Sequence, residues 1–227
     1  MKVRVLDFET SGVPTDTRKA ICEVGYTDFD VETHEIGDPA GSLIDPGHPI
    51  PPETMAVHHI QDHDVVGCPS PAEACRMLMD GMGEDDLFAA HYAEFEQYFF
   101  RGAGRRWICT HKCAVHLWPE APSHANQVLR YWLGFELDGR AMPPHRARPD
   151  SFVTAHILGR MLQCRSIDDL VAWTEGPAIQ TKVTFGKHKG SHWRDLDRDY
   201  LLWLRDNATG LDADTMATVH YWLERSS

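Results

Sequence analysis

The sequence predicts an α/β protein in which helices pack on a mixed β-sheet. Two observations favour this fold class. Three β-rich segments follow one another near the N-terminus, and short apolar strands then alternate with helices. Each strand and helix has an apolar face that has to be covered, and packing helices on a sheet buries the apolar faces of both kinds of element. The chain has 227 residues, of which 42% are hydrophobic, enough for one main core and a small appendage.

The three N-terminal strands are expected at residues 2–8, 21–29 and 41–44. Residues 2–8 alternate in polarity and then end in apolar side chains, and residues 21–29 are rich in β-forming residues. The third segment is followed by the turn-forming sequence Asp-Pro-Gly at residues 45–47. We therefore expect a meander of three strands.

From residue 52 onward the spacing of apolar residues changes to helical lengths. The later elements are, in order, a helix at 71–82, a strand at 87–90, a helix at 93–100, a strand at 106–109, and helices at 112–117, 149–162 and 167–173. Helical crossovers join parallel strands, so a meander followed by such units indicates a mixed sheet.

Gly176 and Pro177 mark the predicted boundary between a main domain, residues 1–176, and a small C-terminal module, residues 177–227. Glycine and proline together interrupt regular structure. The module is expected to contain a basic glycine loop and two helices, at residues 185–190, 199–206 and 212–224.

The formal net charge of −12 argues against a nucleic-acid-binding protein, because Lys and Arg normally neutralise the phosphates. The excess of acid lies upstream of the tail, since residues 177–227 carry seven basic and seven acidic residues. Residues 139–149 and 180–192 each carry three basic residues and no acidic ones. Two small basic surfaces are therefore available.

The chain contains no apolar run near the roughly 20 residues that cross a bilayer, and its start lacks the features of a signal peptide. Its six cysteines are scattered and do not form a dense disulfide framework. We expect a cytoplasmic protein with reduced thiols and no membrane contact.

The end of the first strand carries two acids, Asp7 and Glu9, separated by Phe8. Successive strand side chains point to opposite faces, so both acids face the same way while Phe8 can anchor the strand in the core. Two like charges held together are costly without a cation, and hard divalent ions such as Mg²⁺ prefer carboxylate oxygens. The alternative is an exposed strand end with two solvated acids.

A second candidate segment contains His145 and Asp150. Pro149 suits the first turn of a helix, where the positive end of the helix dipole favours an ionised Asp150. His145 can take a proton from an attacking water near neutral pH, since the ordinary pKa of histidine is about 6.5. The alternative is a histidine in a surface loop, as the chain has 14 histidines.

Together these segments resemble the DEDDh group of 3′–5′ exonucleases, which have a ribonuclease H-like fold. Residues 7–10 (Asp-Phe-Glu-Thr) are similar to the first motif of that group, and His145 followed by Asp150 is similar to its third. The resemblance covers residues 1–173 and implies a mixed five-stranded sheet flanked by helices. It also implies phosphodiester hydrolysis that depends on two Mg²⁺ or Mn²⁺ ions.

The resemblance assigns roles to individual residues. The implied metal ligands are Asp7, Glu9, Glu96 and Asp150, with His145 as the proton acceptor. The implied contacts with the substrate strand are made by Phe8, Thr10, Met55, His58 and His91. Met55 and His58 belong to residues 51–60, which are similar to a family helix that packs beside the terminal nucleotide.

The middle motif departs from the pattern of the group. Tyr92 stands where Asn is usual, and Glu96 stands where Asp is usual. Phe95 and Phe99 are expected to share a helix face that can reach the core. Glu carries its carboxylate one methylene farther out than Asp, so this departure predicts reduced or altered activity. Glu94 is the second candidate for this ligand.

The tail resembles the small C-terminal module of exodeoxyribonuclease X-like proteins at residues 184–190 and 193–204. We predict that it grips the substrate strand, with Lys187 and Lys189 binding phosphates and Trp193 stacking on a base. The alternative is a solvated basic loop, with Trp193 and Trp203 filling a core.

The sequence thus predicts a metal-dependent exonuclease that releases nucleoside monophosphates from single-stranded 3′ ends of nucleic acid, DNA being favoured over RNA. RNA-end trimming is one alternative, and a binding protein that has lost turnover through Tyr92 and Glu96 is another. A homodimer is compatible with the sequence. A zinc site is not expected at residues 109–116, because the spacing of their Cys and His residues fits none of the usual paired patterns.

Overall fold

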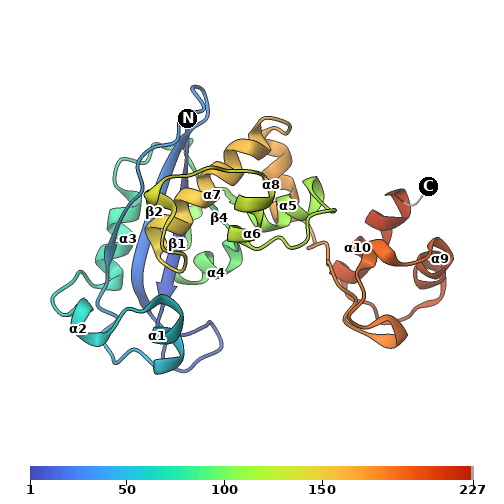
Figure 1. Cartoon of the computed structure of the whole chain (residues 1–227), viewed down its shortest axis with the longest axis horizontal. Helices are drawn as coiled ribbons and strands as arrows, with labels where there is room; N and C mark the ends of the chain where they lie inside the picture. Colours follow the sequence, from blue (N-terminus) through green and yellow to red (C-terminus); the bar gives the residue numbers. More distant parts are fainter. Residues whose placement is uncertain (226–227) are drawn as a thin grey trace.

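The computed structural model describes residues 1–225, which form one five-stranded sheet covered by helices and a helical module at the C-terminal end (Figure 1). The strands are β1 (Lys2–Thr10), β2 (Ile21–Asp30), β3 (Ala40–Leu43), β4 (Leu87–Ala90) and β5 (Trp107–Cys109). Their order is β3-β2-β1-β4-β5. β1, β2 and β3 are antiparallel neighbours, whereas β4 and β5 run parallel to β1. The predicted mixed α/β fold is confirmed.

Helices cover both faces of this sheet, as Figure 1 shows. They include α3 (Pro71–Met79), α4 (Ala93–Phe99), α5 (Thr110–Leu117), α7 (Ala147–Leu162) and α8 (Ile167–Glu175). Val3 and Val5 of β1 pack in a cluster with α5, α7 and α8, while Leu6 and Phe8 pack with α3 and α4. Phe8 anchors the strand in the core, as predicted. The alternation of side chains then directs Asp7 and Glu9 toward the α7 face.

The boundaries of the predicted strands and helices agree with the structure to within three residues at each end. Helix α1 (Pro52–His58) lies in the segment that resembles the family helix. Two short helices, α2 (Asp62–Val65) and α6 (Asn126–Trp132), were not predicted from the sequence. Helix α6 has seven residues and no side-chain hydrogen bond at its N-cap, so it lacks a recognisable start. Helix α3, in contrast, starts with a capping box.

The C-terminal module has its own apolar core. It contains the 3₁₀ helices η3 (Gly186–His188) and η4 (Trp193–Asp195), and the helices α9 (Arg198–Asn207) and α10 (Ala213–Arg225). Trp193 is 0% exposed in this core, so the prediction that it stacks on a base is wrong. Trp203 is 52% exposed, so the alternative in which both tryptophans fill a core is also wrong for Trp203.

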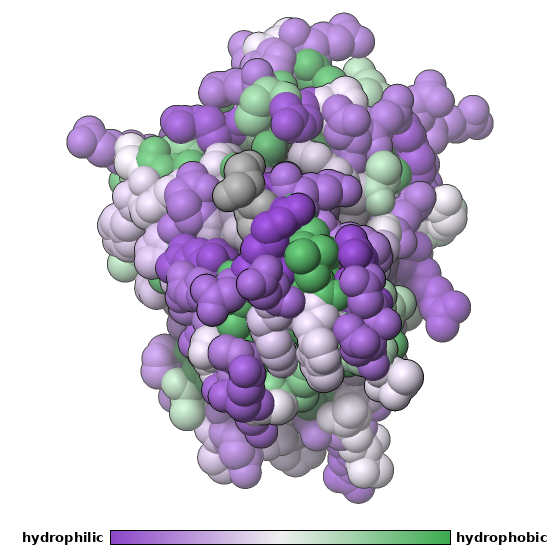
Figure 2. Space-filling view, turned by 90° about the vertical axis from the view of Figure 1, so that its right-hand side faces the viewer, coloured by the Kyte–Doolittle hydropathy of each residue, from purple (hydrophilic) through white to green (hydrophobic). Residues whose placement is uncertain are grey.

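A small apolar cluster joins the module to the main domain. It contains Val115 of α5 together with Ile179 and Tyr221, and the Tyr221 hydroxyl donates a hydrogen bond of 3.1 Å to the Val115 carbonyl. Seen from the side of the module, the surface is mainly hydrophilic with small hydrophobic spots (Figure 2). No helix within residues 1–225 combines the length and apolar character needed to span a membrane.

Candidate active site

Three carboxylates from β1 and α7 meet near the end of β1. Oxygens of Asp7, Glu9 and Asp150 all lie within 4.8 Å of one another. Asp150 is in the first turn of α7, which packs directly on the sheet. Gly25 of β2 permits this close approach, because a Cβ atom at this position would lie 2.1 Å from the Ala147 carbonyl carbon. The missing side chain at Gly25 therefore lets α7 bring Asp150 to Asp7.

A cleft of about 890 Å³ opens over these residues. Its lining includes five acids, of which four are here called the cleft carboxylates: Asp7, Glu9, Glu96 and Asp150. His145 lines the same cleft. Glu96 is only 5% exposed, its Oε2 atom has no hydrogen-bond partner within residues 1–225, and it lies outside the tight group of three. The fold thus gathers all four predicted ligands and the predicted proton acceptor around one space.

Glu94 also lines the cleft, but its surroundings differ from those of Glu96. The Glu94 side chain is 79% exposed, and one of its oxygens lies 3.0 Å from the Lys112 ammonium. The orientation of α4 turns Ala93 and Glu96 inward, together with the C-cap residue Phe100. Phe95 lines the cleft and does not reach the core, contrary to the prediction. Glu96 is therefore the acid without a compensating charge.

Burial and mutual repulsion raise the pKa values of the cleft carboxylates. The pKa of Asp7 lies well above its ordinary value, first because the group is buried and then because Asp150 and Glu9 are close. Burial and the charge of Asp150 raise the pKa of Glu9 to about 8, and burial raises the pKa of Glu96 to about 8. Burial also raises the pKa of Asp150. A site built of buried carboxylate oxygens fits hard divalent cations, which would replace these protons.

A fifth carboxylate, Glu23 of β2, lies opposite Glu9 in the sheet. It accepts hydrogen bonds from Arg146 Nε at 2.9 Å, from Arg146 Nη2 at 2.8 Å and from the Ala147 backbone N–H at 3.0 Å. The Glu23–Arg146 ion pair neutralises Glu23, and the hydrogen bonds to Glu23 fix the backbone directly after His145. Sequence patterns could not predict this contact, because its partners are more than a hundred positions apart.

His145 has a φ angle of 59°, in the left-handed region that residues other than glycine rarely adopt. Its backbone N–H donates a hydrogen bond of 2.7 Å to Asp150 Oδ2, while its side chain is exposed in the cleft. Gln127 Nε2 donates a hydrogen bond of 2.8 Å to Asp150 Oδ1. Both Asp150 oxygens are thus held in place. Gln127 was not predicted as a site residue, because it lies on α6, a helix that the sequence analysis did not predict.

A model of the RNase T exonuclease family matches residues 5–158, more than half of the chain. The chain belongs to this exonuclease family. It is a 3′–5′ exonuclease of the DEDDh type, a hydrolase that acts on nucleic acid. Enzymes of this type depend on divalent metal ions, and the acidic cluster at Asp7, Glu9 and Asp150 agrees with that requirement.

Known proteins resemble this exonuclease in sequence and in structure. Exodeoxyribonuclease 10 of Escherichia coli (strain K12) is 28% identical over 232 residues, which cover 99% of this chain and 100% of the relative. The solved structure of exonuclease X in complex with 5′ overhanging duplex DNA has a TM-score of 0.64 at 27% identity, covering 76% of this chain and 99% of that one. The nuclease domain of 3′hExo, a DEDDh family member bound to rAMP, shares the fold with a TM-score of 0.57 at 19% identity, over 71% of this chain and 92% of that one.

Three residues expected to contact the substrate do not line the cleft of this exonuclease. The Thr10 hydroxyl donates a hydrogen bond of 2.9 Å to the Gly12 carbonyl. His58 is 2% exposed, and its Nδ1 atom accepts a hydrogen bond of 3.0 Å from the Ile60 backbone. Met55 packs against a small apolar cluster next to α1 and α2. These side chains are engaged within the protein and support the region around the site.

The other four expected contacts divide into two groups. Phe8 and His91 line the exonuclease cleft, although they are only 5% and 6% exposed. Lys187 and Lys189 belong to the C-terminal module and do not line the cleft. The Lys187 ammonium lies 5.2 Å from the centre of the Tyr200 ring, in a separate hollow of the module.

Proposed function

We propose that this exonuclease removes nucleoside monophosphates from single-stranded 3′ ends of DNA and uses two Mg²⁺ or Mn²⁺ ions. One observation carries the proposal: within residues 1–225, no Lys or Arg forms an ion pair with a cleft carboxylate, whereas their neighbour Glu23 is paired with Arg146. When ionised, these four carboxylates carry four negative charges, which balance two divalent cations. The fully carboxylate donor set supports hard ions over softer metals.

Each residue of the site has a role in this proposal. The cleft carboxylates would hold the ions, and these would supply positive charge that stabilises the phosphodiester during hydrolysis. His145 accepts the proton of the attacking water. The hydrogen bond from its backbone to Asp150 and the Glu23–Arg146 pair after it fix the position of its backbone. A fixed backbone lowers the entropy that is lost when the imidazole is oriented for proton transfer.

The preference for DNA is supported by the similarity over the whole chain to exodeoxyribonuclease 10 and by the likeness to exonuclease X, which was solved with duplex DNA. We further propose that Lys187 and Lys189 bind the strand outside the cleft. Lys187 lies beside Tyr200 and the exposed Trp203, and cationic and aromatic surfaces together suit single-stranded nucleic acid. A cytoplasmic location and a homodimer stay predictions.

Digestion of matched DNA and RNA oligonucleotides with labelled 5′ ends tests this function. We expect a ladder that shortens one nucleotide at a time, faster on DNA, and only when Mg²⁺ or Mn²⁺ is present. A clear preference for RNA contradicts the substrate assignment. Binding without any release of nucleotide, with either metal, indicates instead a protein that has lost turnover. Unchanged KM and salt dependence after alanine substitution of Lys187 and Lys189 removes the role proposed for these lysines.

A further inference from the structure

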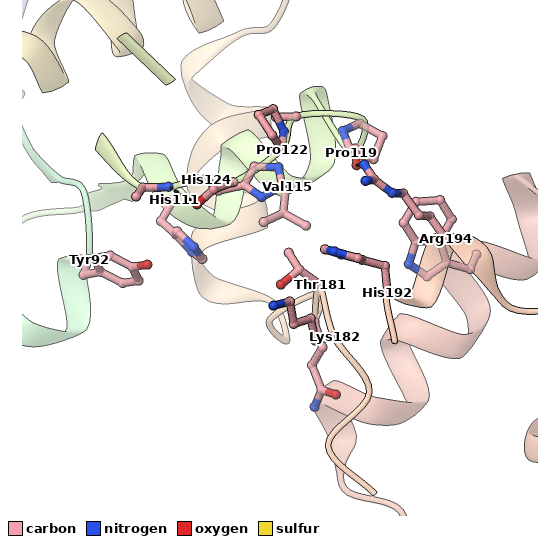
Figure 3. A pocket seen from close by; sticks show the side chains of 15 residues that line it. Tyr92, His111, Val115, Pro119, Pro122, His124, Thr181, Lys182, His192 and Arg194 are labelled. Carbon is pink, nitrogen blue, oxygen red and sulfur yellow. Dashed lines mark hydrogen bonds between the residues drawn. The ribbon is translucent and has the colours of Figure 1, made fainter. Parts of the chain in front are cut away.

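A second cavity, of about 280 Å³, lies between the main domain and the C-terminal module (Figure 3). The main domain contributes Tyr92, His111, Pro119 and residues 121–125 to its lining. The module contributes residues 180–182 together with His192 and Arg194. In Figure 3, Tyr92 and His111 of the main domain lie across the space from Thr181 and His192 of the module. The cavity is therefore built from both parts of the chain.

This cavity adjoins the active-site cleft. Tyr92 and Ala125 line both spaces, so they form the wall between them. Tyr92 is 52% exposed, and its ring stacks on that of His111 with 4.3 Å between the ring centres and 27° between the planes. Burial lowers the pKa of His111 to about 4, so this ring is neutral near pH 7. The wall is thus a flat, uncharged aromatic surface that ligands can reach.

The lining of the cavity contains two basic residues, Lys182 and Arg194, in a strongly acidic protein. None of its lining residues is Asp or Glu, although the chain has 34 acids and 22 Lys and Arg residues. Arg194 is engaged, since Nη1 donates hydrogen bonds of 3.4 Å to the Pro119 carbonyl and 3.2 Å to the Glu120 carbonyl, and Nε lies 3.8 Å from Asp195 Oδ1. Lys182 is exposed, and no hydrogen bond or ion pair holds its ammonium within residues 1–225. Lys182 is the cation that remains available for an anionic ligand.

The direction of degradation determines which part of the substrate can reach this cavity. An enzyme that removes one nucleotide at a time from a 3′ end holds only that nucleotide on the 3′ side of the scissile bond. The rest of the strand leaves the cleft on the 5′ side, and the cavity behind Tyr92 lies next to the cleft. A cation beside an exposed aromatic ring is a pairing that single-stranded nucleic acid favours.

We propose that the cavity binds the substrate strand on the 5′ side of the scissile bond, with Lys182 contacting a backbone phosphate and the Tyr92 ring stacking on a base. This proposal rests on the exonuclease function proposed above and gives the C-terminal module a defined role in it. It also gives a role to Tyr92, which stands at the position where the DEDDh group usually has Asn. Tyr92 forms the wall shared by the cleft and the cavity.

Two substrates separate this contact from the catalytic step. The p-nitrophenyl ester of thymidine 5′-monophosphate has a scissile phosphodiester and no upstream strand, whereas a 5′-labelled single-stranded DNA oligonucleotide has both. We expect Lys182→Ala to lower kcat/KM roughly three- to tenfold on the oligonucleotide and to leave the ester unchanged. Arg76→Ala is the matched control. It also removes one positive charge, from a side chain that is 75% exposed on α3 and lines neither space.

A binding measurement adds a readout that does not need turnover. Fluorescence anisotropy of the labelled oligonucleotide is followed against salt concentration in an Asp7→Asn background. We expect Lys182→Ala to reduce the slope of log K against log salt by about 0.7, the value for one phosphate of a single strand, and Arg76→Ala to leave it unchanged. A slope equal to that of the unsubstituted background overturns the proposal. So does an equal loss of activity on both substrates.

Two further outcomes are also decisive. A loss of activity seen only on duplex DNA indicates that Lys182 contacts the complementary strand, which contradicts the proposal. If the wild-type protein cleaves neither substrate, the proposed function fails, and the anisotropy slope still decides whether Lys182 contacts a phosphate.

Discussion

Replacing Glu23 with Gln tests whether the Glu23–Arg146 pair positions the active site. Glu23 accepts three hydrogen bonds, two from the Arg146 guanidinium and one from the Ala147 backbone. A hydrogen bond to a charged group contributes about 1.5–3 kcal/mol. Gln keeps one acceptor, and the Arg146 side chain is 35% exposed, so solvent screens part of the loss. We therefore expect Glu23→Gln to lower the free energy of unfolding by about 2 kcal/mol, which corresponds to roughly 4–8 °C in Tm.

The substitution should also change the dependence on metal. Glu9 lies opposite Glu23 in the sheet, and its charge already acts on Arg146. Without Glu23, the guanidinium can turn to Glu9 and compete with a cation there. We expect the Mg²⁺ concentration for half-maximal activity to rise roughly tenfold, in the range found when a residue supporting a metal ligand is lost. Titration of activity with Mg²⁺, together with thermal unfolding, measures both effects.

Asp28→Asn is the matched control for Glu23→Gln. Asp28 lies on the same strand and accepts two hydrogen bonds from Arg4, at 2.7 and 2.8 Å, on the face that packs with α3. This variant should lose similar stability and keep the wild-type response to Mg²⁺. If Glu23→Gln unfolds at a lower temperature but keeps the wild-type Mg²⁺ titration and kcat/KM, the pair serves stability alone and the positioning argument is refuted.

Three further predictions concern the carboxylates and the module. Asp7→Asn should lower the rate of nucleotide release by more than about a hundredfold in a gel assay, and retention of the wild-type rate would exclude Asp7 as a ligand. The pKa values of Glu9 and Glu96, about 8 in the folded protein against an ordinary 4.5, mean that the folded state keeps protons that the unfolded chain releases. Metal-free protein should therefore lose stability as the pH rises from about 4.5 to 8, and Mg²⁺ should raise Tm more at pH 8 than at pH 6. A Tm that is independent of pH contradicts this. Trp193→Ala should destabilise the module by about 3–5 kcal/mol in chemical unfolding, whereas Trp203→Ala should change its stability by less than about 1 kcal/mol, because only Trp193 is buried.

Local sequence patterns determined the order of the elements and the first half of the site. The alternation of strand side chains placed Asp7 and Glu9 on one face, with Phe8 in the core on the other. The strand and helix boundaries followed from the same periodicities. The resemblance of two short motifs to DEDDh exonucleases indicated that Asp150 and His145 belong with these acids. Strand alternation, helix periodicity and short motifs all involve positions that are close together in the chain, so they can be recognised in the sequence alone.

Only the tertiary structure decided which distant residues meet. The close packing of α7 at Gly25 brings Asp150 to Asp7, and the register of β1 with β2 sets Glu23 beside Glu9, where Arg146 neutralises it. The same holds in the tail, where Trp193 and Trp203 look alike in sequence but only Trp193 is buried. These outcomes depend on contacts between segments far apart in the chain, and such contacts leave no periodic signal in the sequence.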